Sequence, residues 1–367
     1  MKKVIVYYPF PILNQKSASY VRPLKMIEAF KKMGEQLNFE VMDIFGEGRE
    51  RKQQLKKLQD TVNPDDLLFC YMENNTTPFW LTDRDHIPRN LIFDHYFFHY
   101  LKSNHIPIGI FYRDIYWKFD SFNNGFSSVI LKKVHQMELS VFKKFATKIY
   151  LPTESMNQYV QVSKQQLGVL PPGGENFILE KETNKSMLTV IFVGGVSKRY
   201  GTDKLLQALD IVNKEKKQIH LILVCREHDF ASFKETYSFD YNRTDLEIHH
   251  KSGEELKELY RRSDVGIIPT QKNVYNDFAI PVKLFEYLSY RLPIITTNGR
   301  EKAKIVESNK VGFVVEDSID GLVEGFKHFL SIDIEKTYKD NIEQALLNKH
   351  QWTHRAKAVY DDLLNKD

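Results

Sequence analysis

Short runs of β-branched and aromatic residues alternate with longer segments of helical periodicity, and this alternation constrains the fold more than any other feature. In the first half the runs predict strands at Val4–Tyr8, Phe39–Ile44, Leu67–Tyr71, Ile106–Tyr112 and Lys148–Leu151. In the second half they predict strands at Leu188–Val193, Ile219–Cys225, Leu246–His250, Val265–Ile268, Pro293–Thr296 and Gly312–Val315. Apolar residues three and four positions apart predict helices at Ser19–Met33, Arg49–Asp60, Val129–Ala146, Thr202–Asn213, Gly253–Arg262 and Val282–Tyr290. Two such series are typical of parallel sheets with helices on both faces.

A break in this pattern near mid-chain predicts the boundary between two domains. Leu-Pro-Pro-Gly-Gly at 170–174 interrupts the alternation, and a charged stretch at 180–185 follows it. A length of 367 residues suits two domains, which we place at 1–172 and 173–350. The tail from Ser331 predicts two helices, and the last, about 351–366, is expected to pack back on the first domain. The predicted fold class is α/β, with two doubly wound, Rossmann-like domains facing across a cleft and ligands at the carboxyl ends of the strands.

Composition and charge exclude several other classes of protein. Lys and Arg number 52 against 48 Asp and Glu, a balance that argues against a nucleic-acid-binding protein. Residues 1–172 nevertheless carry 23 basic and 17 acidic residues, a local net charge of +6. Cys70 and Cys225 each lie in an apolar run, so we expect no disulfide framework and a reducing compartment. No apolar stretch has the length of a membrane span, and VIVYY near the N-terminus predicts a strand, not a signal peptide. We therefore expect a cytoplasmic protein, soluble or peripheral to the membrane.

The segment around residues 263–290 carries the strongest functional signal. Ser-Asp-Val-Gly-Ile-Ile-Pro-Thr predicts a buried strand that ends at Pro269, and a helix begins near Pro281 after a polar loop. Lys283 and Glu286 are three positions apart and share one face of that helix. A helix N-terminus with a lysine suits a phosphate, and a glutamate can accept hydrogen bonds from a ribose diol. The alternative is an ordinary surface salt bridge.

A glycine-rich turn and several basic residues follow other strands of the second half. Gly194, Gly195 and Gly201 lie between a predicted strand and helix, either as a phosphate-binding loop or as a tight turn. Lys198 and Arg199 lie in the same loop, and Arg226 follows the strand that ends at Cys225. Each of these cations is either a phosphate ligand or a solvated surface charge.

Three patterns in the first half also suggest sites. Arg113-Asp114 follows a buried strand and is either a site at the cleft or a structural ion pair. His95 and His99 are four positions apart, but no third ligand accompanies them, so packing or surface positions are favoured over a metal site. A helix with an apolar stripe carries lysines that could contact an anionic membrane, although an ordinary core-facing helix is the alternative; these are Lys132, Lys133, Lys143 and Lys144, with Lys148 nearby.

The sequence PVKLFEYLSYRLPIITT resembles the nucleotide-sugar site of family 4 glycosyltransferases of GT-B fold. Val-Gly-Gly at 193–195, Tyr-Gly-Thr-Asp at 200–203 and the mid-chain LPPGG share this resemblance, which covers most of residues 188–315. A proline–x–lysine–x–x–glutamate–tyrosine pattern, here from Pro281 to Tyr287, is similar to a branch often found in surface-polysaccharide synthesis. Two features depart from the family: Phe278, with Asp277 beside it, replaces a glutamate that contacts the donor sugar, and Gly195 replaces an arginine.

The resemblance implies roles for the candidate residues. Glu286 would hold the donor ribose, and the turn containing Ser252 would receive the base. Gly194, Gly195, Lys198, Arg199, Arg226 and Lys283 would bind the diphosphate, with Lys283 also catalytic. Arg113 and Asp114 would lie near the reacting sugar or the acceptor. No metal and no cofactor beyond the donor itself are expected.

The predicted function is therefore transfer of a sugar, with retention, from a nucleoside diphosphate sugar to a glycan or lipid-linked glycan acceptor. The second domain would bind the donor, most simply a UDP-sugar, and the first the acceptor, at the inner face of the membrane. Two alternatives stay open: a catalytically weak GT-B-like subunit that binds glycan or a partner transferase, and a sugar-nucleotide epimerase on the same fold.

Overall fold

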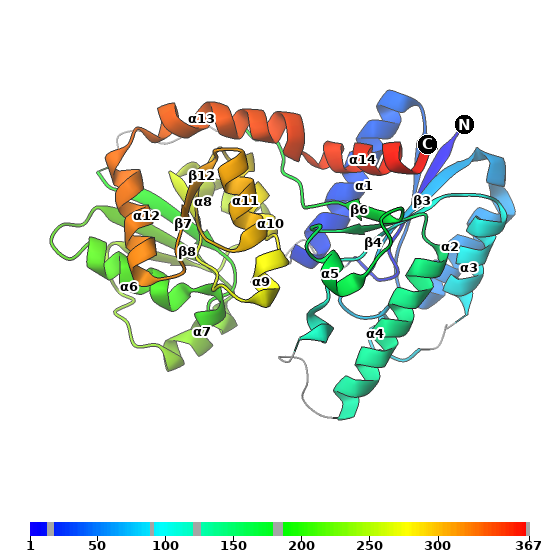
Figure 1. Ribbon diagram of the computed structural model, residues 1–367, viewed down its shortest axis with the longest axis horizontal. Helices are drawn as coiled ribbons and strands as arrows, with labels where there is room; N and C mark the ends of the chain where they lie inside the picture. Colours follow the sequence, from blue (N-terminus) through cyan, green and yellow to red (C-terminus); the bar gives the residue numbers. More distant parts are fainter. Residues whose placement is uncertain (13–17, 89–91, 120–125, 179–185, 365–367) are drawn as a thin grey trace. The chain divides into compact units, whose positions relative to one another are not determined.

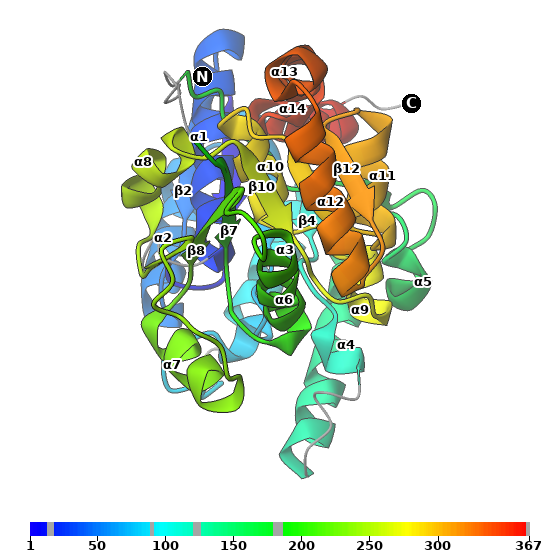
Figure 2. The ribbon, with the colours of Figure 1, turned by 90° about the vertical axis from the view of Figure 1, so that its left-hand side faces the viewer.

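The computed structural model describes residues 1–12, 18–88, 92–119, 126–178 and 186–364. It divides the chain into two compact units. Unit 1 comprises Met1–Pro172 together with Trp352–Asp367, and unit 2 comprises Gly173–Gln351. Each unit contains a six-stranded parallel sheet with helices on its faces, as Figures 1 and 2 show.

The sheet of unit 1 has the strand order β2-β1-β3-β4-β5-β6, and neighbouring strands are parallel. Because both faces are covered, the strands are nearly continuous apolar runs with few exposed side chains. The order reverses between β1 and β3, which is the topological switch point of this unit. The strands are β1 (Lys3–Tyr7), β2 (Glu40–Ile44), β3 (Leu67–Glu73), β4 (Ile108–Phe111), β5 (Lys148–Leu151) and β6 (Leu167–Val169).

Helices cover both faces of this sheet, and the last helix of the chain is one of them. In Figure 1, α14 (red) lies beside α1 (blue), and the two helices pack together. Trp352, Ala356, Val359 and Leu363 of α14 are buried in the same core as residues of α1 and β3. The helices of this unit are α1 (Ala18–Leu37), α2 (Gly48–Thr61), α3 (Phe93–Ser103), α4 (Phe126–Phe145), α5 (Asn157–Val160) and α14 (Trp352–Leu364).

The sheet of unit 2 has the order β12-β11-β10-β7-β8-β9, again with parallel neighbours. Counted from the first strand of the unit, this is the doubly wound order 3-2-1-4-5-6, whose switch point lies between β7 and β10. The strands are β7 (Leu188–Val193), β8 (Ile219–Val224), β9 (Leu246–His249), β10 (Val265–Ile268), β11 (Ile294–Thr297) and β12 (Gly312–Val315).

The helices of unit 2 bury apolar faces against this sheet, in one continuous core. They are α6 (Thr202–Val212), α7 (Glu227–Thr236), α8 (Leu256–Arg261), α9 (Val274–Phe278), α10 (Val282–Ser289), α11 (Arg300–Ser308), α12 (Ile319–Ser331) and α13 (Ile334–Ala345). A 3-10 turn at Lys198–Tyr200 precedes α6, and another at Gly253–Glu255 precedes α8.

The strand–helix alternation predicted the α/β class with two doubly wound parallel sheets, and the structure confirms it. The prediction missed β6 and the helices α3, α5, α7, α9, α11 and α12. The polar loop expected before Pro281 contains the short helix α9, and the helix expected at Gly253–Arg262 begins as a 3-10 turn. The charged stretch at 180–185 lies outside the described residues.

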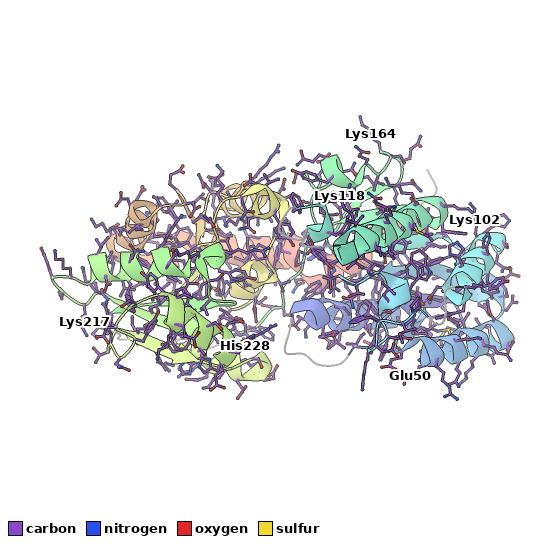
Figure 3. The ribbon with its side chains drawn as sticks, turned by 90° about the horizontal axis from the view of Figure 1, so that it is seen from below. Glu50, Lys102, Lys118, Lys164, Lys217 and His228 are labelled. Carbon is purple, nitrogen blue, oxygen red and sulfur yellow. The ribbon has the colours of Figure 1, made fainter. Side chains whose placement is uncertain are left out.

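The surface of both units is charged. Glu50, Lys102 and Lys217 are exposed, as Figure 3 shows. Among the helices that the structure describes, none combines the length and the apolar character needed to cross a membrane.

Candidate functional site

The carboxyl ends of the strands at the switch point of unit 2 bring together the loops that follow β7 and β10. The Gly194 N–H donates to the Val224 carbonyl, which fixes the end of β7 against β8 (2.9 Å). Gly201 ends the loop after β7 and has φ +71. A Cβ on Gly201 would overlap the carbonyl oxygen of Pro269, the first residue of the loop after β10. Only glycine combines this backbone conformation with so close an approach. The two loops therefore form one edge at the point where doubly wound sheets bind their ligands.

Tyr287 fixes helix α10 at this edge. Its hydroxyl accepts a hydrogen bond from the Val193 N–H (3.1 Å) and donates one to the Ile267 carbonyl (3.3 Å). One side chain thus joins the backbones of β7 and β10, and its ring packs on Gly266, where any Cβ would clash. Since Lys283 and Glu286 lie on the same helix, the hydrogen bonds of Tyr287 also fix the positions of these two side chains.

The Lys283 ammonium lies at the end of β7. It is 2.6 Å from the position that a Cβ on Gly194 would occupy and 4.4 Å from the centroid of the Phe192 ring. Its nitrogen is buried and has no hydrogen-bond partner among the residues that the structure describes. Burial lowers its pKa to about 8, and the charge of Glu286 partly offsets this effect. A buried cation with unused donors is a site for an anion.

Glu286 follows Lys283 by one turn of α10. Burial raises the pKa of its carboxyl group, while the Tyr260 hydroxyl and the Lys283 ammonium act in the opposite direction. The carboxyl group therefore lies in an apolar surrounding that favours hydrogen-bond donors, such as hydroxyl groups, as neighbours.

The loop after β7 places two cations before α6. Lys198 and Arg199 belong to the 3-10 turn at Lys198–Tyr200, and both are exposed. The Arg199 guanidinium lies 5.2 Å from the centroid of the Tyr275 ring on α9, and its carbonyl accepts a hydrogen bond from the Gln271 N–H (3.2 Å). Gly195 packs against the Tyr200 ring, where a Cβ would come within 2.6 Å. Arg199 is thus tied to the loop after β10.

Arg226 and Ser252 follow the two strands at the other side of β7. Arg226 is exposed and precedes α7, directly after β8. Ser252 follows β9, and its N–H donates to the Glu255 carboxylate (3.5 Å) at the start of a 3-10 turn. Within the described residues, no hydrogen bond or ion pair joins Arg226, Ser252 or Lys198 to Lys283 or Glu286. The structure therefore brings Lys283, Gly194 and Glu286 together and leaves the other three at the same sheet edge.

Sequence reasoning missed a second buried lysine at this edge. Lys302 of α11 is 1% exposed, and its ammonium donates to the hydroxyls of Thr270 (2.5 Å) and Thr297 (2.7 Å). It thereby joins the loop after β10 to the end of β11. Burial lowers its pKa to about 7, the charge of Lys283 lowers it further, and Asp317 and Asp277 oppose the shift. The sequence signal that could have revealed Lys302 is the pair of threonines that follow or end two neighbouring strands, Thr270 after β10 and Thr297 in β11.

Helix α9 contains Phe278, the residue at which the sequence departs from the family pattern, and next to it the polar residue Asp277. Phe278 is buried and packs on Tyr275, so it offers nothing to a ligand's hydroxyls. One position earlier, Asp277 has a buried carboxylate oxygen, Oδ1, without a hydrogen-bond partner among the described residues. Its charge raises the pKa of Lys302, which places it near the ammonium group of that lysine.

Arg113 and Asp114 belong to unit 1, after β4. Arg113 pairs with the buried Glu73 (3.4 Å), and burial lowers the pKa of its guanidinium. Asp114 accepts hydrogen bonds from the N–H groups of Ile115 (2.6 Å) and Tyr116 (2.9 Å), which stabilises the turn after the strand. Both residues follow the carboxyl end of β4. The ion pair of Arg113 and the hydrogen bonds of Asp114 stabilise the fold of unit 1 at this point.

The two histidines of α3 pack against an aromatic ring. The rings of His95 and His99 both contact Phe145 of α4, at centroid distances of 5.6 and 4.8 Å. Among the described residues no group of His, Cys, Asp and Glu side chains is arranged to hold a metal ion.

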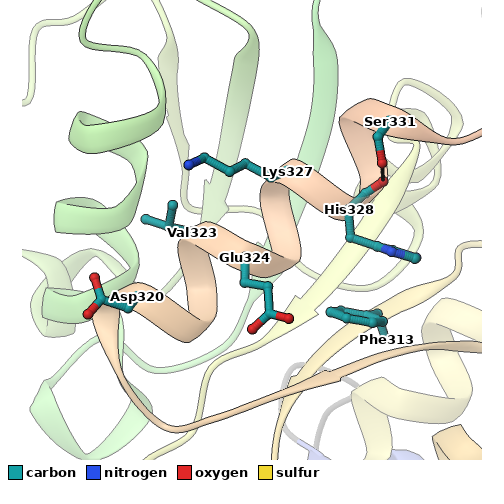
Figure 4. Close-up of a pocket in the computed structure, with 7 residues that line it drawn as sticks. All are labelled: Phe313, Asp320, Val323, Glu324, Lys327, His328 and Ser331. Atoms are coloured by element: carbon teal, nitrogen blue, oxygen red, sulfur yellow. Dashed lines mark hydrogen bonds between the residues drawn. The ribbon is translucent and has the colours of Figure 1, made fainter.

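A pocket elsewhere on unit 2 does not belong to this site. It lies along α12 at the β12 edge of the sheet, where His328 stacks on Phe313 with ring centroids 4.0 Å apart (Figure 4). The sheet edge with Lys283 lies two strands away, at β10 and β7.

Comparison with solved structures identifies the architecture. Sucrose-phosphate synthase from Thermosynechococcus elongatus superposes with a TM-score of 0.64 at 12% identity, over 98% of this chain and 97% of that chain. WaaG, a glycosyltransferase involved in lipopolysaccharide biosynthesis, gives 0.59 at 14% identity over all of both chains. HepE of Anabaena, solved in complex with UDP, gives 0.58 at 12% identity over 100% of this chain and 96% of that chain. No curated protein matches the sequence.

The two doubly wound units and their match to these structures define the GT-B fold. Residues 175–348, nearly all of unit 2, match the family model described as glycosyl transferases group 1. Unit 2 is therefore similar over nearly its whole length to the group 1 glycosyl transferases, and the chain is a glycosyltransferase.

Proposed function

We propose that this glycosyltransferase takes its sugar from a nucleoside diphosphate sugar, with UDP as the nucleotide, and that unit 2 binds this donor. The buried Lys283 ammonium carries the proposal, because its donors are unused among the described residues and it lies against Gly194 at the switch point. A diphosphate supplies the charge that such a group lacks. HepE, of the same fold, was solved with UDP.

Each side chain at the edge has a role in this proposal. Lys283 and the N-terminus of α10 bind the diphosphate and stabilise the charge that develops on the leaving oxygen. Arg199 contributes from the loop after β7, with Lys198 and Arg226 as further cations around the same group. Glu286 accepts hydrogen bonds from the ribose, and the turn at Ser252 receives the base.

Asp277 takes the place of the missing glutamate in recognition of the donor sugar. Its Oδ1 is buried and has no partner among the described residues, whereas the Phe278 side chain is packed in the core. A sugar hydroxyl that donates to Oδ1 would satisfy this oxygen. The transfer itself is proposed to retain the anomeric configuration, as in the family that the sequence resembles, and to need no metal.

The acceptor is proposed to be a glycan or a lipid-linked glycan in surface-polysaccharide or glycoconjugate synthesis, with unit 1 as its binding unit. Support comes from the proline–x–lysine–x–x–glutamate–tyrosine pattern and from the likeness to WaaG, which acts in lipopolysaccharide biosynthesis. Arg113 and Asp114 are the candidates for contact with the reacting groups.

A panel of UDP-, GDP- and dTDP-sugars in a thermal-shift experiment tests the donor. UDP and UDP-sugars should stabilise the protein, since a ligand that binds only the folded state raises the melting temperature. Stabilisation by GDP- or dTDP-sugars alone would show that the donor carries one of those nucleotides and not UDP. No stabilisation by any nucleotide sugar would show that unit 2 does not bind a donor at this site.

The replaced glutamate at Phe278 favours a second candidate, a binding subunit with weak or no catalysis. Release of nucleoside diphosphate from the sugar nucleotide separates the two, because a binding subunit is stabilised by UDP but releases none. An epimerase would instead convert the donor sugar without an acceptor.

A further inference from the structure

The ammonium group of Lys302 holds the start of the loop after β10. It donates to the hydroxyls of Thr270 (2.5 Å) and Thr297 (2.7 Å) and to the Thr270 carbonyl (3.3 Å). The Thr297 hydroxyl in turn donates to the same carbonyl (2.6 Å). Thr270 follows Pro269, at the point where the loop leaves β10. Because a buried ammonium ion is costly unless its donors are used, these contacts fix the lysine and the loop together.

The backbone around Lys302 is shaped to fit its side chain. Gly299 precedes α11, and a Cβ on it would come within 2.6 Å of the Lys302 Cε. The same Cβ would lie 3.4 Å from the Asn276 carbonyl oxygen on α9. Helix α11 packs on α9, and both can be followed in Figure 1. Lys302 therefore lies in the seam between its own helix and the short helix of the loop.

Helix α9 carries the polar group that this seam supports. The Asn273 side chain accepts a hydrogen bond from the Asn276 N–H (2.8 Å) and caps the helix. Asp277 comes next, and its buried Oδ1 has no hydrogen-bond partner among the described residues. Burial lowers the pKa of Lys302 and the charge of Asp277 opposes this shift, so the two groups are neighbours. The lysine uses its donors on the threonines, which leaves Oδ1 available to a ligand.

We infer that Lys302 is a positioning residue of the donor site, which holds Asp277 where its carboxylate meets hydroxyl groups of the donor sugar. It does so by fixing the loop after β10 to the end of β11, and it thereby determines which sugar is selected. A carboxylate that is held in one place before the ligand arrives discriminates better between hydroxyl configurations than a mobile one. The inference rests on the proposed function, in which unit 2 binds a UDP-sugar and Asp277 contacts the sugar.

Two further anchors of the loop do not involve Lys302. The Gln271 N–H donates to the Arg199 carbonyl (3.2 Å), and the Lys272 N–H donates to the Asp317 carboxylate (2.8 Å). Loss of the lysine contacts should therefore loosen the start of the loop and the seam with α9 while unit 2 stays folded.

Titration calorimetry with UDP, UDP-glucose, UDP-galactose and UDP-N-acetylglucosamine tests the inference. Wild type should bind one of the three sugars more tightly than the others. Lys302→Met has a side chain of similar size without the charge and the donors, so it should still bind UDP. The ratio of its affinities for the best and the worst sugar should fall about tenfold, the lower end of the effect of a hydrogen bond to a charged group. Thr297→Val should show a smaller loss in the same direction, since the Thr270 hydroxyl remains.

A double-variant cycle separates positioning from a general structural role. Asp277→Ala should also reduce sugar discrimination, because it removes the group that contacts the sugar. If Lys302 acts through Asp277, Lys302→Met combined with Asp277→Ala should lose no more discrimination than Asp277→Ala alone. Losses that add would overturn the inference. Lys304→Met changes an exposed lysine two positions away on the same helix, and this matched control should discriminate like wild type.

Failure of the donor site and failure of this inference give different results. No binding of UDP by wild type would reject the donor site, and the inference with it. If wild type binds UDP but has equal affinities for the three sugars, the donor site stands and the role in sugar selection is wrong. The same conclusion would follow if Lys302→Met and Thr297→Val discriminated like wild type, or if Lys304→Met lost as much as Lys302→Met.

Discussion

Lys283 and Glu286 lie one turn apart on α10, and burial disfavours the charged form of each. It lowers the pKa of the lysine to about 8 and raises that of the glutamate. In the proposed site a nucleoside diphosphate would offset both effects, because its phosphates would favour the ammonium ion and its ribose hydroxyls would favour the carboxylate.

Replacement of Glu286 tests the ribose contact. Glu286→Ala should weaken UDP binding by about 10- to 100-fold, the effect of losing hydrogen bonds to a charged group. Titration calorimetry with UDP measures it. Glu307→Ala, an exposed glutamate on α11, is the control and should bind like wild type. Equal affinities in the two variants would remove Glu286 from the site.

The pH dependence of binding tests the charge of Lys283. Below about pH 8 the lysine is a cation, and above it the group loses the proton that attracts the diphosphate. UDP affinity should therefore fall as pH rises through 8 and beyond. Lys283→Met should bind weakly and show little change over the same range. A wild-type affinity that stays constant from pH 7 to about 9.5, where the terminal phosphate with its pKa near 6 is fully ionised, would contradict this assignment.

The residues of the site differ in how far the sequence could predict them. The strand–loop–helix pattern around Lys283 predicted its place at the edge of the sheet, because position after a strand and within the first turn of a helix is local information. Lys302 was missed, since REKAKIVES gives no local sign that Lys302 is buried while Lys304 is exposed. The bridge made by Tyr287 depends on two strands that only the tertiary fold brings together.

At the level of elements, the loop before α6 is shaped by its contact with the end of β10. Gly201→Ala should destabilise unit 2, by about 1–2 kcal/mol for the left-handed backbone and more for the overlap with the Pro269 carbonyl. Gly253→Ala has a similar φ of +61 and open space around the new Cβ, so it should show the backbone cost alone. Hydrogen exchange of β7 and β10 measures the difference. Equal losses of stability in the two variants would mean that the loop before α6 shifts away from the Pro269 carbonyl at no cost.

The elements that the sequence did not predict are those with weak local signals. The strand β6 has three residues and an exposed Val169, too short for alternation to show. Helix α12 contains Gly321 and Gly325, poor helix formers that are present because the helix packs closely: a Cβ on Gly325 would come within 2.9 Å of Ile295. Tertiary packing overrides propensity here, which local periodicity cannot reveal. The longer, buried strands were predicted because apolar runs suffice for parallel sheets.

At the scale of the whole molecule, the chain returns to unit 1 after unit 2, and α14 completes the first core. Val359→Asp would bury a carboxylate among α1, α14 and β3, at a cost of several kcal/mol. All three tryptophans, Trp80, Trp117 and Trp352, lie in unit 1 and report its unfolding by fluorescence. The midpoint should fall, while hydrogen exchange of the unit 2 strands stays as in wild type. Loss of protection in both units would show that α14 stabilises more than unit 1.

Lys283 and Arg199 are proposed to stabilise the leaving diphosphate, and turnover of the purified enzyme with a UDP-sugar tests this role most directly. Interactions that strengthen in the transition state lower kcat more than they raise KM, and loss of one such donor costs about 10²–10³ in rate. Lys283→Ala and Arg199→Ala should each release UDP that much more slowly, with the buried Lys283 giving the larger loss. Lys304→Ala, an exposed lysine on α11, should release it at the wild-type rate. If Lys283→Ala and Arg199→Ala turn over like wild type, the diphosphate is bound elsewhere.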